Sequence, residues 1–425
     1  MLLREKIIGI ARRIYQAYGY APIDTPALEY EEILIGKGGA ETDKQLYRFE
    51  DHGGRRVGMR FDLTVPLARF AAQHIGDLGT PLKRYQIATV WRGENTQRGR
   101  YREFVQCDFD TIGTQSIVAD IETALVIHDL LLAIGFDRFT ICINNRKILT
   151  GILETLDLSD RATGILRSLD KLAKIGRERT EAEMVEACGV SHKQANQILA
   201  LSDLAGSNED ILDQVEKLTA DSPIGLEGTA QLRQVVSALE AAGVPNSRVR
   251  LDVSIARGLD YYTGTIYETF LDALPDIGSI CSGGRYDNLA GLYTRTPLPG
   301  VGASLGLDRL LAAMEEVNMV EKVSTPAEVF MVYFDAERLN DYLKLAADLR
   351  AGGLRVELYG EPKKIGQQLK YADRRGHSLA VVAGSREFES GTCQLKNLRS
   401  GKSLALSLAG GPDELIATIH KQLAE

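Results

Sequence analysis

The sequence is poor in cysteine, and its cysteines are not placed to share a metal ion or a disulfide framework. Five cysteines occur among 425 residues, at positions 107, 142, 188, 281 and 393, without a Cys-X-X-Cys pair and without a histidine at zinc-ligand spacing. Structural zinc sites use closely spaced Cys and His ligands, and disulfide scaffolds are dense in cysteine. We therefore expect no metal centre, no disulfide framework and a reducing cytoplasmic compartment.

Long apolar runs are also missing. The opening residues, MLLREKIIGIARRIYQAYGY, are interrupted by charge every few positions, and no apolar stretch later in the chain is long. A membrane helix needs about 20 consecutive apolar residues, and a signal peptide needs a continuous apolar centre. The sequence therefore predicts neither.

The sequence also has no excess of basic residues. Fifty Lys and Arg residues stand against 58 Asp and Glu residues, which gives a formal net charge of −8. Because nonspecific binding to nucleic acid relies on abundant Lys and Arg, any contact with nucleic acid must use local basic patches.

The apolar pattern divides the chain into segments of different character. The first segment is an amphipathic helix, ended by Gly19, with one apolar face made of Leu3, Ile7, Ile10, Ile14 and Tyr18. An extended segment with Pro22 and Pro26 follows, then a Gly-rich loop at 36–39 and a strand from Val57 to Phe61. Residues 82–113 read as a strand, an Arg-rich loop and a second strand.

The second half predicts an interrupted domain followed by a separate one. Residues 147–240 are rich in helix-forming Leu, Ala, Glu and Lys, whereas strands return at 248–255 and 263–271. After a linker near 324–327, strands alternate with helices, which is typical of an α/β domain with a mainly parallel sheet. We expect a domain at 1–325, interrupted by a helical insertion at 147–240, and a second domain at 326–425.

The Arg-rich segment carries the first chemical signal. It contains Lys83, Arg84, Arg92, Arg98, Arg100 and Arg102. A solvated basic hairpin is the usual interpretation of such a pattern. However, a buried unpaired guanidinium is costly, so an Arg among Val90, Trp91 and Phe104 favours an anionic partner such as a polyphosphate.

Residues 84–113, RYQIATVWRGENTQRGRYREFVQCDFDTIG, resemble motif 2 of the class II aminoacyl-tRNA synthetases, specifically the histidyl form. The resemblance implies that Arg92 holds the α-phosphate and the amino-acid carboxylate, and that Glu94 binds the adenine amino group. It implies that Phe104 stacks on the adenine ring and that Arg100 lies near the outer phosphates.

Three further segments extend the resemblance. GVGASLGLDRL at 300–310 is similar to motif 3, which assigns Arg309 to the γ-phosphate. RGLDYYTG at 257–264 and SGGRYDNL at 282–289 resemble the segments peculiar to histidyl-tRNA synthetases. Tyr pairs and Gly clusters more often serve packing than binding, so the combination of segments carries the assignment.

The resemblance also implies a histidine site. Asp62, Thr64 and Gln106 would bind the α-ammonium group, and Arg257 would join Arg92 at the reacting carboxylate and phosphate. Asp110, Tyr262 and Tyr286 would bind the imidazole ring, which needs both a donor and an acceptor. The six histidines, at 52, 74, 128, 192, 377 and 420, lie outside the motifs and are expected at the surface or in caps.

Together these features predict an α+β catalytic domain with an antiparallel sheet, a helical insertion and a C-terminal α/β anticodon-binding domain. The implied activity is ATP-dependent activation of L-histidine and its transfer to tRNA(His), with ATP carried as its Mg²⁺ complex. The segment YGYAPIDTPALE at 18–29 resembles motif 1, which implies a homodimer. The family's pattern includes a further segment before the opening helix, so either the chain begins late or that segment is dispensable. The basic cluster at Lys363, Lys364, Lys370, Arg374, Arg375 and His377 is either a solvated face or an anticodon-stem contact.

Two alternatives remain open at this point. A non-catalytic, histidine-sensing regulatory subunit related to the family would need a histidine pocket but no phosphate chemistry. Another class II synthetase would lack the paired segments at 257–264 and 282–289.

Overall fold

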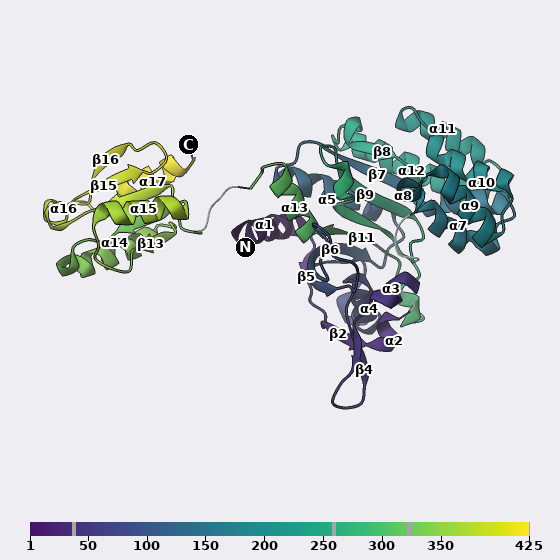
Figure 1. Ribbon diagram of the computed structural model, residues 1–425, viewed down its shortest axis with the longest axis horizontal. Helices are drawn as coiled ribbons and strands as arrows, with labels where there is room; N and C mark the ends of the chain where they lie inside the picture. Colours follow the sequence, from purple (N-terminus) through teal and green to yellow (C-terminus); the bar gives the residue numbers. More distant parts are fainter. Residues whose placement is uncertain (36–39, 257–260, 321–324, 425) are drawn as a thin grey trace. The chain divides into compact units, whose positions relative to one another are not determined.

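The computed structural model describes residues 1–35, 40–256, 261–320 and 325–424. They form two compact units, one comprising Lys6–Met319 and the other comprising Met1–Glu5 with Val320–Glu425 (Figure 1). The predicted loop at 36–39, Arg257 and part of the predicted linker lie outside the described residues.

In the larger unit, eight described strands form one mixed sheet. In sheet order they are β1 (Ala21–Pro22), β5 (Leu82–Trp91), β6 (Glu103–Ile112), β11 (Gly300–Gly306), β10 (Cys281–Arg285), β9 (Thr265–Leu271), β7 (Phe139–Asn145) and β8 (Val249–Leu251). Pairing is antiparallel from β5 to β7, whereas β1 and β8 join the two edges in parallel. The antiparallel sheet predicted from the sequence therefore forms the centre of this unit.

Helices α1 (Leu2–Ala17) and α5 (Ile117–Ile134) cover one face of this sheet. Successive strand residues point to opposite faces, so Cys107 and Phe109 share the face that Tyr15 of α1 contacts. The Tyr15 hydroxyl donates to the Cys107 carbonyl at 3.0 Å, and its ring centroid lies 5.1 Å from that of Phe109. Tyr267 of β9 donates to the Asp120 carbonyl of α5 at 2.7 Å. The side chains that alternate with Cys107 and Phe109 point to the opposite face of the sheet, which α1 and α5 do not cover.

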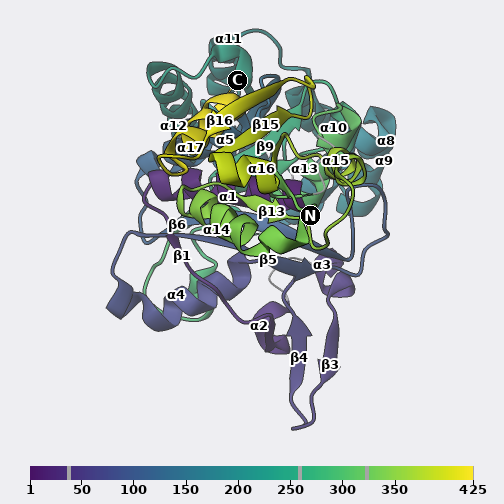
Figure 2. The ribbon, with the colours of Figure 1, turned by 90° about the vertical axis from the view of Figure 1, so that its left-hand side faces the viewer.

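A smaller three-stranded sheet has the order β2 (Leu28–Tyr30), β4 (Arg56–Met59) and β3 (Arg48–Glu50). The β3–β4 hairpin extends away from the rest of its unit (Figures 1 and 2). Short helices α2 (Glu31–Leu34) and α3 (Ala40–Gln45) and the longer α4 (Thr64–Leu78) accompany it. Residues 60–63 connect β4 to α4 and lie against β5 of the large sheet, where Arg60 Nε donates to the Thr89 carbonyl at 3.0 Å.

Between β7 and β8 the chain is helical. The helices are α6 (Arg146–Thr155), α7 (Ala162–Leu169), α8 (Leu172–Ile175), α9 (Arg177–Cys188), α10 (His192–Leu199), α11 (Asn208–Leu218) and α12 (Pro223–Ala241). A Cβ on Gly151 would lie 2.7 Å from the Gly225 Cα, so α6 and α12 cross with their backbones in close approach. Glycine at both positions makes this crossing possible.

The smaller unit contains a five-stranded sheet of order β13 (Val356–Leu358), β12 (Val329–Val332), β14 (Leu379–Val382), β15 (Thr392–Asn397) and β16 (Ser403–Ser407). Its helices are α14 (Leu339–Ala351), α15 (Ile365–Arg375), α16 (Ser385–Ser390) and α17 (Asp413–Ala424). The first three strands are parallel, as the alternation of strands and helices predicts, and β15 and β16 add an antiparallel hairpin. Within the described residues, none of the helices has the length and apolarity to span a bilayer.

Candidate active site

The open face of the large sheet is polar along β6. Phe104, Gln106, Asp108 and Asp110 alternate with core residues, so their side chains share the face opposite α1 and α5. Across the ladders, Arg84 of β5 and Gly302 of β11 both stand beside Asp110. Three separate segments of the sequence therefore meet at one point of the sheet.

Glycines of β11 make room for the side chains of their neighbours. A Cβ on Gly302 would lie 2.3 Å from Asp110 Oδ1, and one on Gly300 would lie 2.3 Å from the Tyr286 ring. Both positions therefore exclude any larger residue unless these groups move. The glycines of the motif-3-like segment thus have a direct packing role beside Asp110.

Asp110 is held from two sides. Arg84 Nη2 lies 2.7 Å from Asp110 Oδ2, and both side chains are almost completely buried. The Tyr286 hydroxyl donates to Asp110 Oδ1 at 2.5 Å. The predicted ring-binding residues Asp110 and Tyr286 are therefore in direct contact. Tyr262 lies near them, because its ring packs edge-on to that of Tyr261, which packs edge-on to Tyr286 with ring centroids 5.8 Å apart.

Asp62 reaches the same region from the segment that precedes α4. Its Oδ1 accepts the Val65 N–H at 3.0 Å, which starts the helix, and its Oδ2 accepts the Tyr261 hydroxyl at 3.5 Å. Thr64 lies close enough to the Tyr261 hydroxyl to influence its pKa, and the Tyr261 ring packs edge-on to Tyr262, with ring centroids 5.1 Å apart. The structure thus brings Asp62 and Thr64 to the tyrosines near Asp110.

Three buried carboxyl groups occupy this region. Burial raises the pKa of Asp62 to about 6 and that of Asp108 to about 7, and it also raises the pKa of Asp110. The Arg84 guanidinium opposes the rise in all three, and Arg92 opposes it at Asp62. Asp62 and Asp108 therefore change their protonation state close to neutral pH.

We expect Asp108→Asn to stabilise the ligand-free protein at about pH 8 by on the order of 2–4 kcal/mol, and by about half of that or less near pH 5. A carboxyl with a raised folded-state pKa contributes stability that is fully present below its unfolded-state pKa of about 4, and this stability is lost as pH rises from there through the folded-state pKa. Asn resembles the neutral carboxyl and removes the loss. Urea unfolding at both pH values tests this, with the exposed Asp77→Asn as control. Equal stability of Asp108→Asn and the parent chain at about pH 8 would contradict the assignment.

The predicted nucleotide residues gather at the far end of β5 and β6. Arg92 Nε donates to the Phe61 carbonyl at 2.9 Å, and its guanidinium lies 5.2 Å from the centre of the Phe104 ring. Glu94 and Arg100 form an ion pair of 3.9 Å in the loop between the strands. The Phe104 ring is half-buried and thus has an accessible part.

Helix α13 (Leu307–Glu316) brings Arg309 to this loop. The Asp308 carboxylate accepts the Val105 N–H at 2.8 Å, and a Cβ on Gly99 would lie 3.3 Å from the Arg309 Cα. Arg309 also donates to the Ser279 carbonyl. Arg309 of the motif-3-like segment therefore lies beside the loop that carries Arg100, whereas Arg257 lies outside the described residues.

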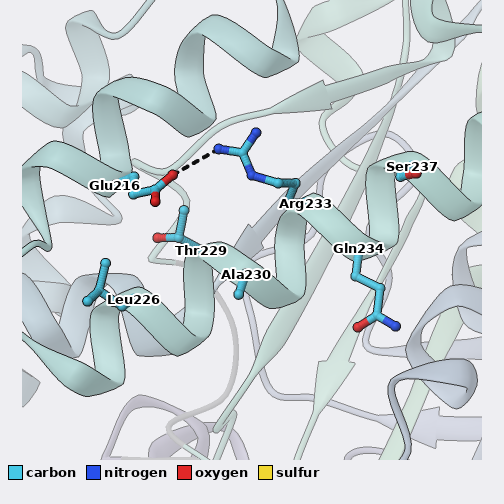
Figure 3. Close-up of a pocket in the computed structure, with 7 residues that line it drawn as sticks. All are labelled: Glu216, Leu226, Thr229, Ala230, Arg233, Gln234 and Ser237. Atoms are coloured by element: carbon cyan, nitrogen blue, oxygen red, sulfur yellow. Dashed lines mark hydrogen bonds and ion pairs between the residues drawn. The ribbon is translucent and has the colours of Figure 1, made fainter.

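A cavity of about 610 Å³ lies elsewhere, between α11 and α12 of the helical insertion (Figure 3). It is lined by Glu216, Leu226, Thr229, Ala230, Arg233, Gln234 and Ser237, and none of the predicted site residues belongs to it. Arg233 there pairs with Glu216 at 3.0 Å. This cavity is therefore separate from the active site that the sequence predicts.

Sequence reasoning missed several residues of the site. Arg84 was recognised only as part of a basic segment, and Asp108, Ser304 and Tyr261 were not singled out. The Gln106 amide donates to the Ser304 hydroxyl at 2.6 Å. The alternation of Gln106, Asp108 and Asp110 on one strand could have indicated Asp108, whereas the partners of Arg84 depend on the strand register.

The expectation that all histidines lie at the surface or in caps is wrong for two of them. His128 is buried, and His377 is buried with its Nε2 3.0 Å from Glu357 Oε2. His377 therefore belongs to the interior of the smaller unit and not to the basic cluster on α15. Apolar residues around it, including Phe330, exclude it from solvent.

Comparisons with known proteins agree with this arrangement. The family model for histidyl-tRNA synthetase matches residues 3–310, and the anticodon binding domain model matches residues 328–419. A histidine–tRNA ligase of Rhodopirellula baltica is 59% identical over 99% of this chain and 95% of its own length. One of Wolinella succinogenes is 44% identical over 94% of this chain and 91% of its own.

Among solved structures, the histidyl-tRNA synthetase of Nostoc sp. PCC 7120 superposes with a TM-score of 0.89 at 35% identity, covering 99% of this chain and 95% of that one. The polar strand face, the arginines at its far end and these full-length matches lead to the same assignment. The chain belongs to the histidyl-tRNA synthetase family, a family of class II aminoacyl-tRNA synthetases.

Proposed function

We propose that this chain condenses L-histidine with ATP to form histidyl-adenylate and then transfers histidine to the 3′ end of tRNA(His). The observation that carries the proposal is the buried Asp110 carboxylate, held between Tyr286 and Arg84 beside the nucleotide-side arginines. Family membership supports histidine, ATP and tRNA as substrates. The regulatory alternative gains no support from the full-length relatives, which are named histidine–tRNA ligases.

Recognition of the imidazole ring is assigned to Asp110, Tyr262 and Tyr286. A neutral imidazole presents one donor and one acceptor nitrogen, and a carboxylate beside tyrosine hydroxyls supplies the matching groups. A buried polar pocket rejects an apolar side chain because its own groups would lose their partners. The contact between Asp110 and Tyr286 supports this assignment.

The α-ammonium group is assigned to Asp62, Thr64 and Gln106. Asp62 and Gln106 are buried, and they approach the pocket from the start of α4 and from β6. A carboxylate with two polar acceptors suits an ammonium group, which has three donors and no acceptor. Binding would order these side chains around the substrate.

Adenylate formation requires two anions to approach each other. The histidine carboxylate attacks the α-phosphate, a bond to the phosphorus forms, and pyrophosphate leaves with the electron pair of the broken bond. Arg92 and Arg257 are assigned to the shared charge, because guanidinium groups stay charged and donate to carboxylate and phosphate in a planar fork. Donors placed at the developing charge lower the barrier.

The remaining nucleotide contacts are assigned to four residues. Glu94 would accept a hydrogen bond from the adenine amino group, and Phe104 would stack on the adenine ring. Arg100 and Arg309 would bind the outer phosphates of ATP. Mg²⁺ would bind chiefly to those phosphates, since this hard ion keeps most of its water in proteins. The gathering of Arg92, Arg100 and Arg309 suits such a polyphosphate.

The domain at 326–425 is assigned to the anticodon arm of the tRNA, and the domain at 1–325, with its insertion at 147–240, to catalysis. Exposed basic residues on and before α15 suit contact with phosphate, although Lys363 already pairs with Glu361 at 2.6 Å. A cytoplasmic location fits the free thiols of all five cysteines.

The proposal is tested by amino-acid-dependent exchange of pyrophosphate into ATP, run separately with each of the standard amino acids. We expect exchange with histidine and at most background with the others, followed by charging of tRNA(His). Binding of histidine without any exchange would favour the regulatory alternative. Exchange with a different amino acid would reject the pocket assignment.

We also propose that the chain is a homodimer and that the three-stranded sheet contributes to the interface. One face of this sheet exposes Leu28, Tyr30, Tyr47 and Phe49, and Tyr30 and Phe49 flank Val57 in one cross-strand row. Neighbouring exposed apolar residues mark interaction surfaces. A second copy is the expected occupant, because β2 belongs to the motif-1-like segment.

Tyr30→Asp combined with Phe49→Asp should shift the protein from dimer to monomer, because charge on a buried interface is unfavourable by several kcal/mol. Sedimentation at micromolar concentration measures the change. Leu404→Asp, on exposed β16 of the other unit, is the control and should leave the mass unaltered. A double variant that remains dimeric would place the interface elsewhere.

A further inference from the structure

Arg84 is a fully buried cation in a central strand. It has no exposed side-chain surface, its Nη2 lies 2.7 Å from Asp110 Oδ2, and Nη2 also donates to the Leu63 carbonyl at 3.1 Å. Its Nε and Nη1 are buried and have no hydrogen-bond partner among the described residues. Burying a guanidinium is costly unless its charge is used, so a purely structural role is a poor explanation.

The charge of Arg84 acts on the substrate-binding carboxylates. Desolvation raises the pKa of Asp62, Asp108 and Asp110, and the Arg84 guanidinium is the first opposing influence at both Asp108 and Asp110. Asp110 would otherwise be pushed toward its protonated form. A protonated carboxyl offers one of its oxygens as a donor and loses acceptor capacity.

The geometry leaves Asp110 free to accept another hydrogen bond. Tyr286 donates to Oδ1, whereas Oδ2 lies 2.7 Å from Arg84 Nη2 as an ion pair but accepts no hydrogen bond within the described residues, so acceptor capacity remains on the carboxylate. Titratable or charged groups from several elements face this carboxylate. They are Arg84 of β5, Asp108 of β6, Asp62 before α4, Tyr262 before β9 and Tyr286 after β10.

We propose that Arg84 is a positioning residue for histidine recognition, whose ion pair with Asp110 keeps that carboxylate ionised and oriented to accept the N–H of the substrate imidazole. This inference rests on the proposed function. It distinguishes Arg84 from Arg92, which lies at the reacting groups. Arg84 touches neither substrate nor nucleotide and acts through Asp110.

The role makes a specific prediction about pH. Without Arg84 the pKa of Asp110 rises further, so the carboxyl is neutral at a pH where the parent chain holds it charged. Histidine binding is then weakened at low pH and recovers as pH rises through the new pKa. A residue that only supports the fold would weaken binding equally at every pH or lower the stability alone.

The experiment uses the full chain with Arg84→Met and Arg84→Lys in histidine-dependent pyrophosphate exchange, from about pH 6.5 to about pH 9. Each KM is divided by that of the parent chain at the same pH, which cancels the titration of free histidine. Arg84→Met should raise the KM for histidine about 10- to 100-fold near pH 7, as expected for a lost charged hydrogen bond, and the ratio should fall toward one at the upper pH. The KM for ATP should change less than about threefold.

Arg84→Lys keeps the charge with a weaker, single-atom contact. It should show a smaller rise in the KM for histidine at the lowest pH, and that rise should disappear at the highest. The control is Arg69→Met, which breaks a largely buried pair with Glu29 of 2.7 Å outside the site. This control should lower the melting temperature without changing either KM.

Arg84→Met with the parent KM at all pH values, or with a KM ratio independent of pH, overturns the inference. If Arg84→Met shows no cooperative melt, the test relies on Arg84→Lys. A KM for histidine of Arg84→Lys that equals the parent value, or that is raised by the same factor at every pH, also overturns the inference. A parent chain that lacks histidine-dependent exchange would instead reject the proposed function. The two failures are therefore distinguishable.

Discussion

Arg92→Ala should slow histidine-dependent pyrophosphate exchange by about 10²- to 10³-fold, because it removes a charge-assisted contact that strengthens in the transition state. In the proposed role, Arg92 bridges the attacking carboxylate and the α-phosphate. The substitution also removes the hydrogen bond to the Phe61 carbonyl and the contact with the Phe104 ring. These losses should cost about 1 kcal/mol of stability, so the protein should still fold.

The matched control is Arg98→Ala in the same basic segment. Arg98 is exposed and pairs with Glu316 at 3.3 Å, and exposed pairs of this kind contribute less than about 1 kcal/mol. Its exchange rate should stay within about twofold of the parent rate. Exchange kinetics and a thermal melt of the same preparations separate catalysis from stability. Equal rates for Arg92→Ala and Arg98→Ala would remove Arg92 from the reacting centre.

Deleting residues 326–425 should preserve adenylate formation and reduce tRNA charging by at least about 10²-fold, since losing several polar contacts of about 1 kcal/mol each produces such an effect. The proposed activation residues that the structure describes lie in the unit Lys6–Met319. The smaller unit has its own apolar core, formed by residues between Val329 and Ile419. Each unit therefore has the packing that a separate domain needs.

Two measurements on the truncated chain test this prediction. Pyrophosphate exchange should remain within about threefold of that of the full chain, whereas charging of tRNA(His) should be nearly lost. The full chain charged with tRNA of altered anticodon provides the control, since it removes the same contact from the RNA side. Normal charging by the truncated chain would reject the anticodon assignment, and loss of a cooperative melt would show that the units depend on each other.

Local patterns in the sequence were sufficient for much of the fold. The apolar spacing of the first segment, ended by Gly19 with a φ of +81°, predicted the span of α1. The predicted apolar face was partly wrong, because the buried residues are Ile7, Ile8, Ala11 and Tyr15. The two strands around the Arg-rich loop became β5 and β6, and the helix-rich composition at 147–240 corresponds to α6–α12. These features depend on neighbours a few positions apart, which is why periodicity reveals them.

Other features required the tertiary structure. The hairpin of β15 and β16 was missed because its strands are short and only partly buried, so their apolar alternation is weak. His377 looked like part of a basic surface cluster, yet its side chain is buried beside Phe330 and Glu357. Burial of a polar residue depends on partners far away in the sequence, and no local pattern identifies them.

The candidate site shows the same division. The resemblance to motif 2 assigned roles to Phe104, Gln106 and Asp110, and the alternation of side chains along β6 places all three on one face. The pairing of Arg84 with Asp110, and the space that Gly302 leaves for its carboxylate, follow only from the folded sheet. Those contacts depend on the register of β5, β6 and β11, and a shift of one residue would turn each side chain to the opposite face. Register is set by packing of the whole sheet, so it follows from long-range contacts and not from local sequence.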